Sequence, residues 1–117
     1  MSILMILNDP PYGTERTYNG LRLAINLLTK NDDLDLTVFL MGDAASSAKS
    51  GQTTPNGYYN VERMLSSVLR KSGKVLACGT CMDARGLTDE DLVPGATRST
   101  LDELTALTTS SRKVLVF

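Results

Sequence analysis

Histidine and tryptophan are both absent from this chain, and cysteine occurs only twice. The missing histidine removes the commonest general base and the commonest zinc ligand of proteins. Two cysteines in 117 residues do not suggest a disulfide scaffold, and in a reducing compartment such a pair more often marks redox, persulfide or metal chemistry. Any chemistry at these cysteines must therefore proceed without an imidazole.

Long apolar runs and blocks of like charge are missing as well. No stretch approaches the roughly 20 apolar residues of a membrane span, and the first residues carry no basic segment of the kind that opens a secretory signal. We therefore expect a cytoplasmic protein with no membrane partner. A net charge of −1 and a sequence pI near 5.3, without a basic patch, exclude a typical nucleic-acid binder.

Apolar runs of strand length alternate with helical stripes along the whole chain. The predicted strands are Ile3–Leu7, Asp35–Met41, Lys74–Ala77 and Val114–Phe117, with a fifth short strand between Gly95 and Arg98. Strands separated by helices of this length indicate βαβ units. We expect one domain over residues 1–117, with a mostly parallel five-stranded sheet and helices on both faces.

The helices between these strands are predicted from their start and stop signals. The expected N-cap residues are Thr14, Asp43, Thr88, and Ser99 or Thr100. The stripe that precedes the third strand ends at Lys71-Ser72-Gly73, where Gly73 is expected at the C′ position, just past the helix end.

Three loops follow predicted strands and carry the candidate site. They are Asn8–Gly13, Gly42-Asp43 and Cys78–Gly86. In parallel sheets, ligands and chemistry collect at the carboxyl ends of the strands, where these loops lie. Cys78 and Cys81 belong to the third loop, so their position and their chemistry agree.

Cys78, Cys81 and Arg85 are the candidate catalytic residues. Backbone N–H groups at a helix start favour the thiolate form of Cys78, and Arg85 lies one to two turns later, where it can face back toward the sulfur. The spacing of Cys81 from Cys78 permits a disulfide. The plainer alternative is that Cys78 is a small buried hydrophobe at the end of a strand.

Metal binding and thioredoxin-like chemistry are weighed against this hypothesis. A zinc site normally takes four protein ligands, and one CxxC in a chain without histidine supplies two, so we expect no metal and no cofactor. Thioredoxin-like proteins carry CxxC after the first strand, whereas Cys78 follows the third predicted strand. A CxxC thiol–disulfide protein nevertheless remains an alternative.

Six further residues are expected to wall a partly covered pocket around the cysteines: Asn8, Tyr12, Gly13, Glu15, Thr80 and Asp83. Each has an ordinary structural interpretation. Asp83 is typical of a turn, and Glu15 of an early helical position. The segment Pro10-Pro11-Tyr12-Gly13 lacks the glycine spacing of a phosphate loop and is typical of a rigid turn.

Several segments together resemble one protein family. They include Pro11-Tyr12-Gly13-Thr14-Glu15, Asn19-Gly20-Leu21-Arg22-Leu23-Ala24, Cys78-x-Thr80-Cys81-x-Asp83-x-Arg85-Gly86 and Lys113-Val114-Leu115. In these segments the chain resembles the DsrE/DsrF-like family, and within it the YchN-like branch. The resemblance implies a three-layer α/β/α sandwich. It also implies a homo-oligomer, a trimer or a hexamer, with sites near subunit boundaries.

The same resemblance implies sulfur chemistry. Members that relay sulfur carry it as a persulfide on one cysteine. In their motif a glycine follows that cysteine eight residues later, with an arginine just before the glycine, and Cys78 is followed by Arg85-Gly86 at the same spacing. Cys81 lies outside that motif but matches the YchN-like branch. The expected function is a sulfurtransferase-type persulfide carrier with Cys78 as the sulfur-accepting thiolate and with sulfur donor and acceptor proteins as partners. The alternative is a non-catalytic oligomeric or small-ligand-binding module with structural cysteines.

Overall fold

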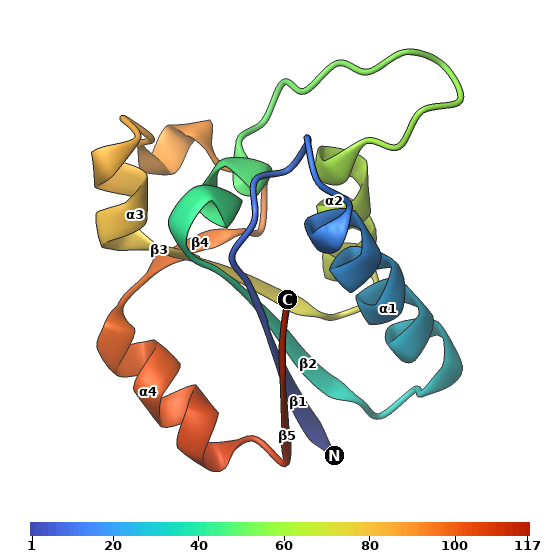
Figure 1. Cartoon of the computed structure of the whole chain (residues 1–117). Coiled ribbons are helices and arrows are strands. Elements are labelled where there is room, and N and C mark those ends of the chain that lie inside the picture. The colour runs from blue at the N-terminus through green and yellow to red at the C-terminus, as the bar shows by residue number, and fades with distance from the viewer.

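Five parallel strands form the centre of the molecule (Figure 1). A computed structural model describes all 117 residues. In chain order the elements are β1 (Ser2–Leu7), α1 (Arg16–Lys30), β2 (Asp35–Leu40), the 3₁₀ segment η1 (Gly42–Ala48), α2 (Val61–Arg70), β3 (Lys74–Cys78), α3 (Gly79–Ala84), the 3₁₀ turn η2 (Asp89–Asp91), β4 (Thr97–Ser99), α4 (Leu101–Ser110) and β5 (Lys113–Val116).

The sheet has the order β4-β3-β2-β1-β5, and every neighbouring pair is parallel. The predicted α/β fold is confirmed, and the sheet is parallel throughout rather than mostly parallel. Helical or 3₁₀ crossovers connect the strands, as parallel pairing requires. The predicted fifth strand exists, but it begins at Thr97 and ends at Ser99, later than expected.

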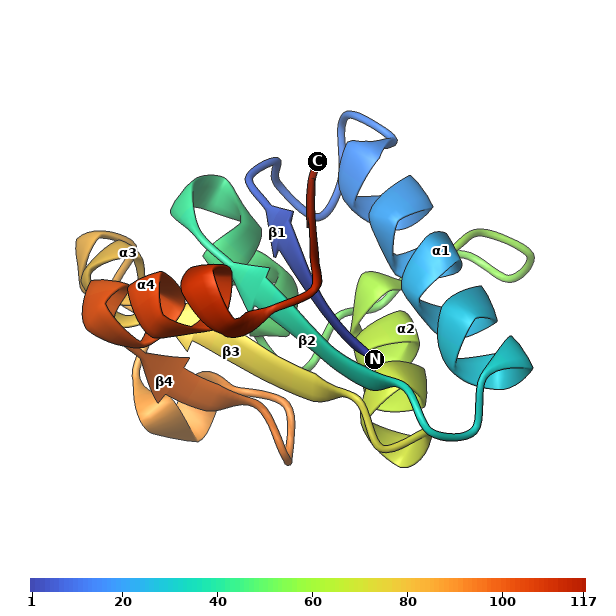
Figure 2. The same cartoon turned by 90° about the horizontal axis from the view of Figure 1, so that it is seen from below.

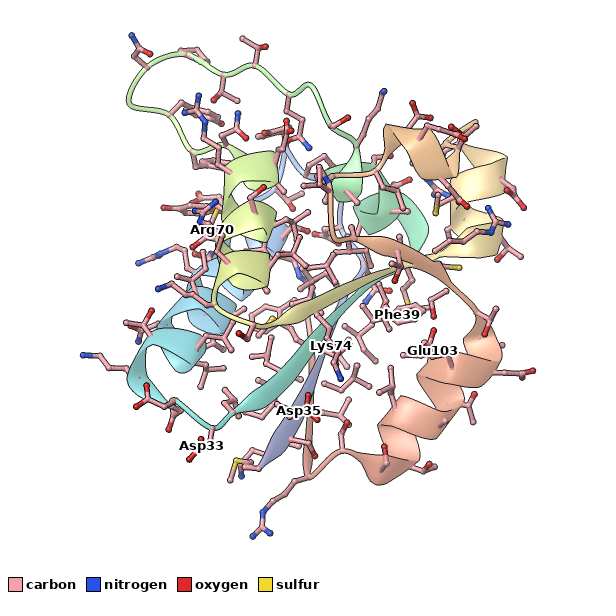
Figure 3. All side chains as sticks on the ribbon, turned by 180° about the vertical axis from the view of Figure 1, so that it is seen from behind. Asp33, Asp35, Phe39, Arg70, Lys74 and Glu103 are labelled. Atoms are coloured by element: carbon pink, nitrogen blue, oxygen red, sulfur yellow. The ribbon has the colours of Figure 1, made fainter.

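Helices cover the two faces of the sheet unequally (Figure 2). The face under α1, α2 and η1 holds the main core, a cluster of 19 buried apolar residues. On the opposite face, α4 buries only the small cluster of Leu4, Phe39 and Leu104. Figure 3 shows Phe39 of β2 between the sheet and α4. The layer formed by α4 is therefore thin.

Two of the predicted N-caps are wrong because their side chains have other partners. The Thr14 hydroxyl donates to Asp9 Oδ2 at 2.9 Å, and α1 begins only at Arg16. Asp43 lies inside η1, where its carboxylate accepts from Arg85. The other two predictions are confirmed.

Thr100 accepts from the backbone N–H of Glu103 at the start of α4, and Thr88 forms a capping box with Asp91 around the single turn η2. A turn of three residues replaces the helix that Thr88 suggested, because Leu92 is already extended.

The end of α2 also differs from its prediction. Ser72, not Gly73, takes the left-handed conformation, with φ of 70°. A Cβ on Gly73 would lie 2.6 Å from Val68 Cγ1 and 3.0 Å from Leu28 Cδ1. Gly73 is therefore required by close packing rather than by its backbone angles. None of the helices combines the length and the apolar character needed to cross a membrane.

Candidate functional site

The two cysteines meet where β3 ends and α3 begins. Cys78 is the last residue of β3, and Cys81 lies in the first turn of α3. The Cys81 thiol donates to the Cys78 sulfur across 2.8 Å, and both residues are free cysteines. The predicted placement of the pair at the carboxyl end of a parallel strand is therefore correct.

Each sulfur belongs to a different face of the sheet. Cys78 packs against the small cluster under α4, whereas Cys81 packs against the main core. Both side chains are half-buried. The sulfurs therefore contact each other across the end of the sheet, with different surroundings on each side.

The pKa of Cys78 lies below its ordinary value. Burial by itself would raise this pKa, but hydrogen bonds from the Cys81 thiol, from the Thr80 hydroxyl and from the backbone N–H groups of both residues outweigh burial. The Thr80 oxygen lies 3.4 Å from the Cys78 sulfur. Donors that surround a sulfur favour its thiolate form.

The pKa of Cys81 is shifted in the opposite direction. Burial raises it, and the hydrogen bond that Cys81 donates to Cys78 raises it further. Two groups oppose this shift in part: the backbone N–H of Gly42, which donates to the Cys81 sulfur at 3.1 Å, and the Arg85 guanidinium. The pair therefore favours a thiolate at Cys78 and a thiol at Cys81.

Arg85 lies beside Cys81. Its Nη1 donates to the Cys81 carbonyl oxygen at 3.0 Å, and its Nε and Nη2 donate to Asp43 Oδ1 at 3.1 Å and 2.6 Å. These contacts join α3 to η1. Arg85 therefore holds the turn that carries Cys81, and among the two sulfurs it lowers the pKa of Cys81.

Arg98 on β4 is a site residue that the sequence analysis missed. Its Nη1 and Nη2 donate to the two carboxylate oxygens of Asp83 at 2.9 Å and 2.8 Å. The hydrogen bonds to Asp83 raise the pKa of Arg98, and the negative charge of Cys78 adds to this effect. A Cβ on Gly79 would lie only 2.8 Å from Arg98 Nε. The glycine after Cys78 thus leaves room for this guanidinium.

The register of the sheet brings Arg98 to the site, since Ala77 pairs with Arg98 and Cys78 with Ser99. A single arginine in a short polar strand gives no sequence signal of this kind. Asp83, predicted as a pocket residue, serves here as the partner of Arg98.

Asn8 and Tyr12, predicted to wall the pocket, form hydrogen bonds with residues other than the cysteines. Asn8 donates its side-chain N–H to the Phe117 carbonyl, and its own carbonyl lies near Gly42. The Tyr12 hydroxyl donates to Gln52 Oε1 at 2.6 Å and accepts from the Val61 N–H at 3.0 Å. None of these hydrogen bonds reaches either cysteine.

Tyr12 belongs to a cluster that contains all four tyrosines of the chain. Tyr59 is at its centre, with ring centroids 4.2 Å from Tyr18, 4.6 Å from Tyr58 and 5.6 Å from Tyr12. Tyr58, burial and smaller effects that include Glu15 raise the pKa of Tyr59 to about 12. Glu15 therefore acts on the tyrosines, and Gly13 has open space around it.

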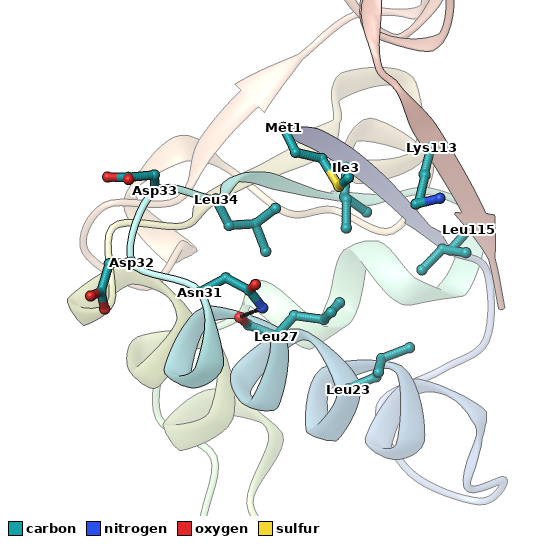
Figure 4. Close-up of a pocket in the computed structure, with 10 residues that line it drawn as sticks. All are labelled: Met1, Ile3, Leu23, Leu27, Asn31, Asp32, Asp33, Leu34, Lys113 and Leu115. Atoms are coloured by element: carbon teal, nitrogen blue, oxygen red, sulfur yellow. Dashed lines mark hydrogen bonds between the residues drawn. The ribbon is translucent and has the colours of Figure 1, made fainter.

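A mainly apolar pocket of about 530 Å³ lies at the opposite edge of the sheet (Figure 4). It is bounded by α1 and by the amino ends of β1 and β5, with Leu23, Leu27 and Leu115 among its walls. The pocket is therefore separate from the cysteines. No group of three or more histidine, cysteine, aspartate or glutamate residues is placed to hold a metal ion.

Comparisons with known proteins place the chain in a family. The model of the DsrE/DsrF-like family matches residues 1–117. Protein YchN of Escherichia coli is 41% identical over 115 residues, covering 98% of this chain and 97% of that protein. An uncharacterised protein of Methanocaldococcus jannaschii is 33% identical over the full length of both chains.

Solved structures agree with these sequence matches. The crystal structure of the ychN protein from E. coli has a TM-score of 0.94 at 40% identity and covers 99% of this chain and 98% of that one. A protein of unknown function from Methanobacterium thermoautotrophicum shares the fold, with a TM-score of 0.78 at 14% identity over 99% of this chain and 97% of that one. This chain belongs to the DsrE/DsrF-like family and is similar to YchN.

Proposed function

We propose that this protein is a persulfide sulfur acceptor in which Cys78 takes up sulfane sulfur. The observation that carries the proposal is the 2.8 Å contact in which Cys81 donates to Cys78. That contact favours a thiolate at Cys78, and the thiolate is the nucleophilic form of cysteine. Membership of the DsrE/DsrF-like family supports sulfur as the cargo, because that family is associated with sulfur relay.

The transfer step balances without a metal or a cofactor. The Cys78 thiolate attacks the outer sulfur of a donor persulfide, R–S–SH. A sulfur–sulfur bond forms on Cys78, the donor's sulfur–sulfur bond breaks, and the donor leaves as the thiolate R–S⁻. Donors around Cys78, such as the Thr80 hydroxyl, stabilise the charged reactant.

Sulfur loading is measured by intact-protein mass spectrometry after exposure to an excess of a small-molecule persulfide. The Cys81→Ser variant keeps Cys78 as its only thiol and is expected to gain the mass of one sulfur atom. The Cys78→Ser variant is the matched control, nearly equal in size, and is expected to gain none. Loading of Cys78→Ser alone would reverse the roles, and loading of neither variant would reject the proposal.

We also propose that the chain acts in the cytoplasm as a homo-oligomer, a trimer or a hexamer. Supporting this, apolar side chains are exposed along α4 and β5, with Leu101 69% and Val116 62% exposed. Because Cys78 packs under the same helix, a second copy on this face would place the site near a subunit boundary. Light scattering at micromolar concentration tests the assembly, and a monomeric mass would reject it.

A CxxC thiol–disulfide protein is the second candidate, and the proximity of the two sulfurs favours it. It predicts that the pair cycles between dithiol and disulfide while neither variant retains sulfur. The same mass measurement distinguishes the two functions.

A further inference from the structure

Cys81 lies where its sulfur can displace the outer sulfur of a persulfide on Cys78. Its sulfur is 2.8 Å from the Cys78 sulfur, and a disulfide bond is about 2.05 Å long, so bond formation needs a shift of less than about 1 Å. The contact is with the sulfur of Cys78 itself, which becomes the inner sulfur of a persulfide. Attack at that atom expels the outer sulfur.

The two faces of the sheet separate the entering sulfur from the leaving one. Cys81 approaches from the main core, whereas Cys78 packs against the thinly covered face under α4. An outer sulfur on Cys78 can therefore take the side opposite Cys81, toward the thinner layer. Displacement at sulfur requires this arrangement of nucleophile and leaving group on opposite sides.

Burial still raises the pKa of Cys81 after loading, but the second contribution, the hydrogen bond that Cys81 donates to the Cys78 thiolate, is removed. In the unloaded site, Cys81 donates to a Cys78 thiolate, and this contact holds its proton in place. Once Cys78 carries a second sulfur, its inner sulfur is no longer an anion. The Gly42 N–H at 3.1 Å and the Arg85 guanidinium, itself paired with Asp43, remain to stabilise a Cys81 thiolate.

An acceptor in solution competes poorly with this reaction. Well-oriented groups within one molecule have effective concentrations on the order of 10⁵ M or more, far above the concentration of any soluble acceptor thiol. Hydrosulfide is also a better leaving group than an alkyl thiolate, because H₂S is the stronger acid. Figure 1 shows α3 at the end of β3 with η1 beside it. Gly42, which donates to the Cys81 sulfur, belongs to η1 of the same chain, so this hydrogen bond does not depend on an acceptor protein.

We infer that this site reduces persulfides, releasing the sulfur as hydrogen sulfide and leaving a Cys78–Cys81 disulfide. The inference rests on the proposed function, since Cys78 must first accept sulfur. Cys81 loses its proton to solvent and attacks as a thiolate, forming the new sulfur–sulfur bond with Cys78. The bond between the inner and outer sulfurs of Cys78–S–SH breaks, and the outer sulfur leaves as HS⁻, which takes up a proton from water to give H₂S. A dithiol reductant then restores both thiols, so that overall R–S–SH and a dithiol give R–SH, H₂S and a cyclic or protein disulfide.

Two readouts test the inference on the full-length protein after one short exposure to a small-molecule persulfide and rapid removal of the donor. Wild type is expected to release about one equivalent of sulfide at a sulfide electrode and to lose two hydrogen atoms in intact mass. Dithiothreitol, added afterwards, restores both free thiols. Cys81→Ser is expected to hold the added sulfur at least about tenfold longer, without disulfide formation.

The outcomes separate the two proposals. If Cys81→Ser loads but wild type retains its sulfur as long, or releases sulfide without forming a disulfide, the inference is wrong and the carrier function stands. If no variant takes up sulfur, the proposed function itself fails. Cys81→Ala gives a second variant without the nucleophile, and circular dichroism shows whether either variant has lost the fold.

Discussion

The two faces of the sheet differ in thickness, and each holds one cysteine. The thick face, under α1 and α2, buries a cluster of 19 residues and contacts Cys81. The thin face, under α4, buries three residues and contacts Cys78. This difference suggests a division of labour: the well-packed face fixes the position of one sulfur, and the lightly covered face gives substrates access to the other.

The largest expected difference is in reactivity between the two thiols. Iodoacetamide reacts with thiolates, so Cys78, whose pKa is lowered, should react at least about tenfold faster at neutral pH than Cys81 in the wild-type protein, where the hydrogen bond between the two sulfurs is intact. Mass spectrometry over time follows both rates.

The pH dependence sharpens the same comparison. Alkylation of the wild-type protein is quenched after set times at a series of pH values from acidic to alkaline. The pH at which the alkylation rate is half-maximal should lie below that of an ordinary cysteine for Cys78 and above it for Cys81. The direction follows because a lowered pKa populates the thiolate at lower pH. Equal and slow alkylation of both residues would favour structural cysteines.

Stability should also distinguish the faces. Leu65 is fully buried in the main core, and Leu65→Ala should lower the free energy of unfolding by about 2–5 kcal/mol. Leu104→Ala, on the α4 face, is the matched substitution and should cost less, because the thin layer can collapse around the smaller side chain. Urea titration of both variants measures the difference, and equal losses would contradict it.

The smallest expected effect concerns Arg98. Gly79→Ala places a methyl carbon only 2.8 Å from Arg98 Nε, so the guanidinium must move and its pairing with Asp83 weakens. We expect a small upward shift in the half-maximal pH of Cys78 alkylation, because a nearby positive charge moves away from the thiolate. Arg98→Met should give the same shift.

Adding Gly79→Ala to Arg98→Met should then produce no further shift, since the positive charge that Gly79→Ala displaces has already been removed. Additive shifts would contradict a shared mechanism and would indicate that the alanine acts on the α3 backbone instead.

Most of the fold was predictable from the sequence, because it depends on patterns local to each element. Apolar runs such as Ile3–Leu7 are found as strands to within a residue or two, and Thr100 caps α4 as its side chain suggested. The errors arose where a side chain has a partner other than the helix start, nearby or distant in the chain. Thr14 bonds to Asp9 and Asp43 to Arg85, and these contacts take the side chains away from capping.

The sequence by itself determined that two cysteines, one turn apart, follow a buried strand of an α/β protein. Only the tertiary structure decided what surrounds each sulfur. It placed Asp43 against Arg85 and the Gly42 N–H against the Cys81 sulfur, and it placed Arg98 at the site through the pairing of β3 with β4. The physical reason is that spacing along a helix turn fixes neighbours within the turn, whereas sheet register and layer thickness arise from contacts between segments far apart in the chain.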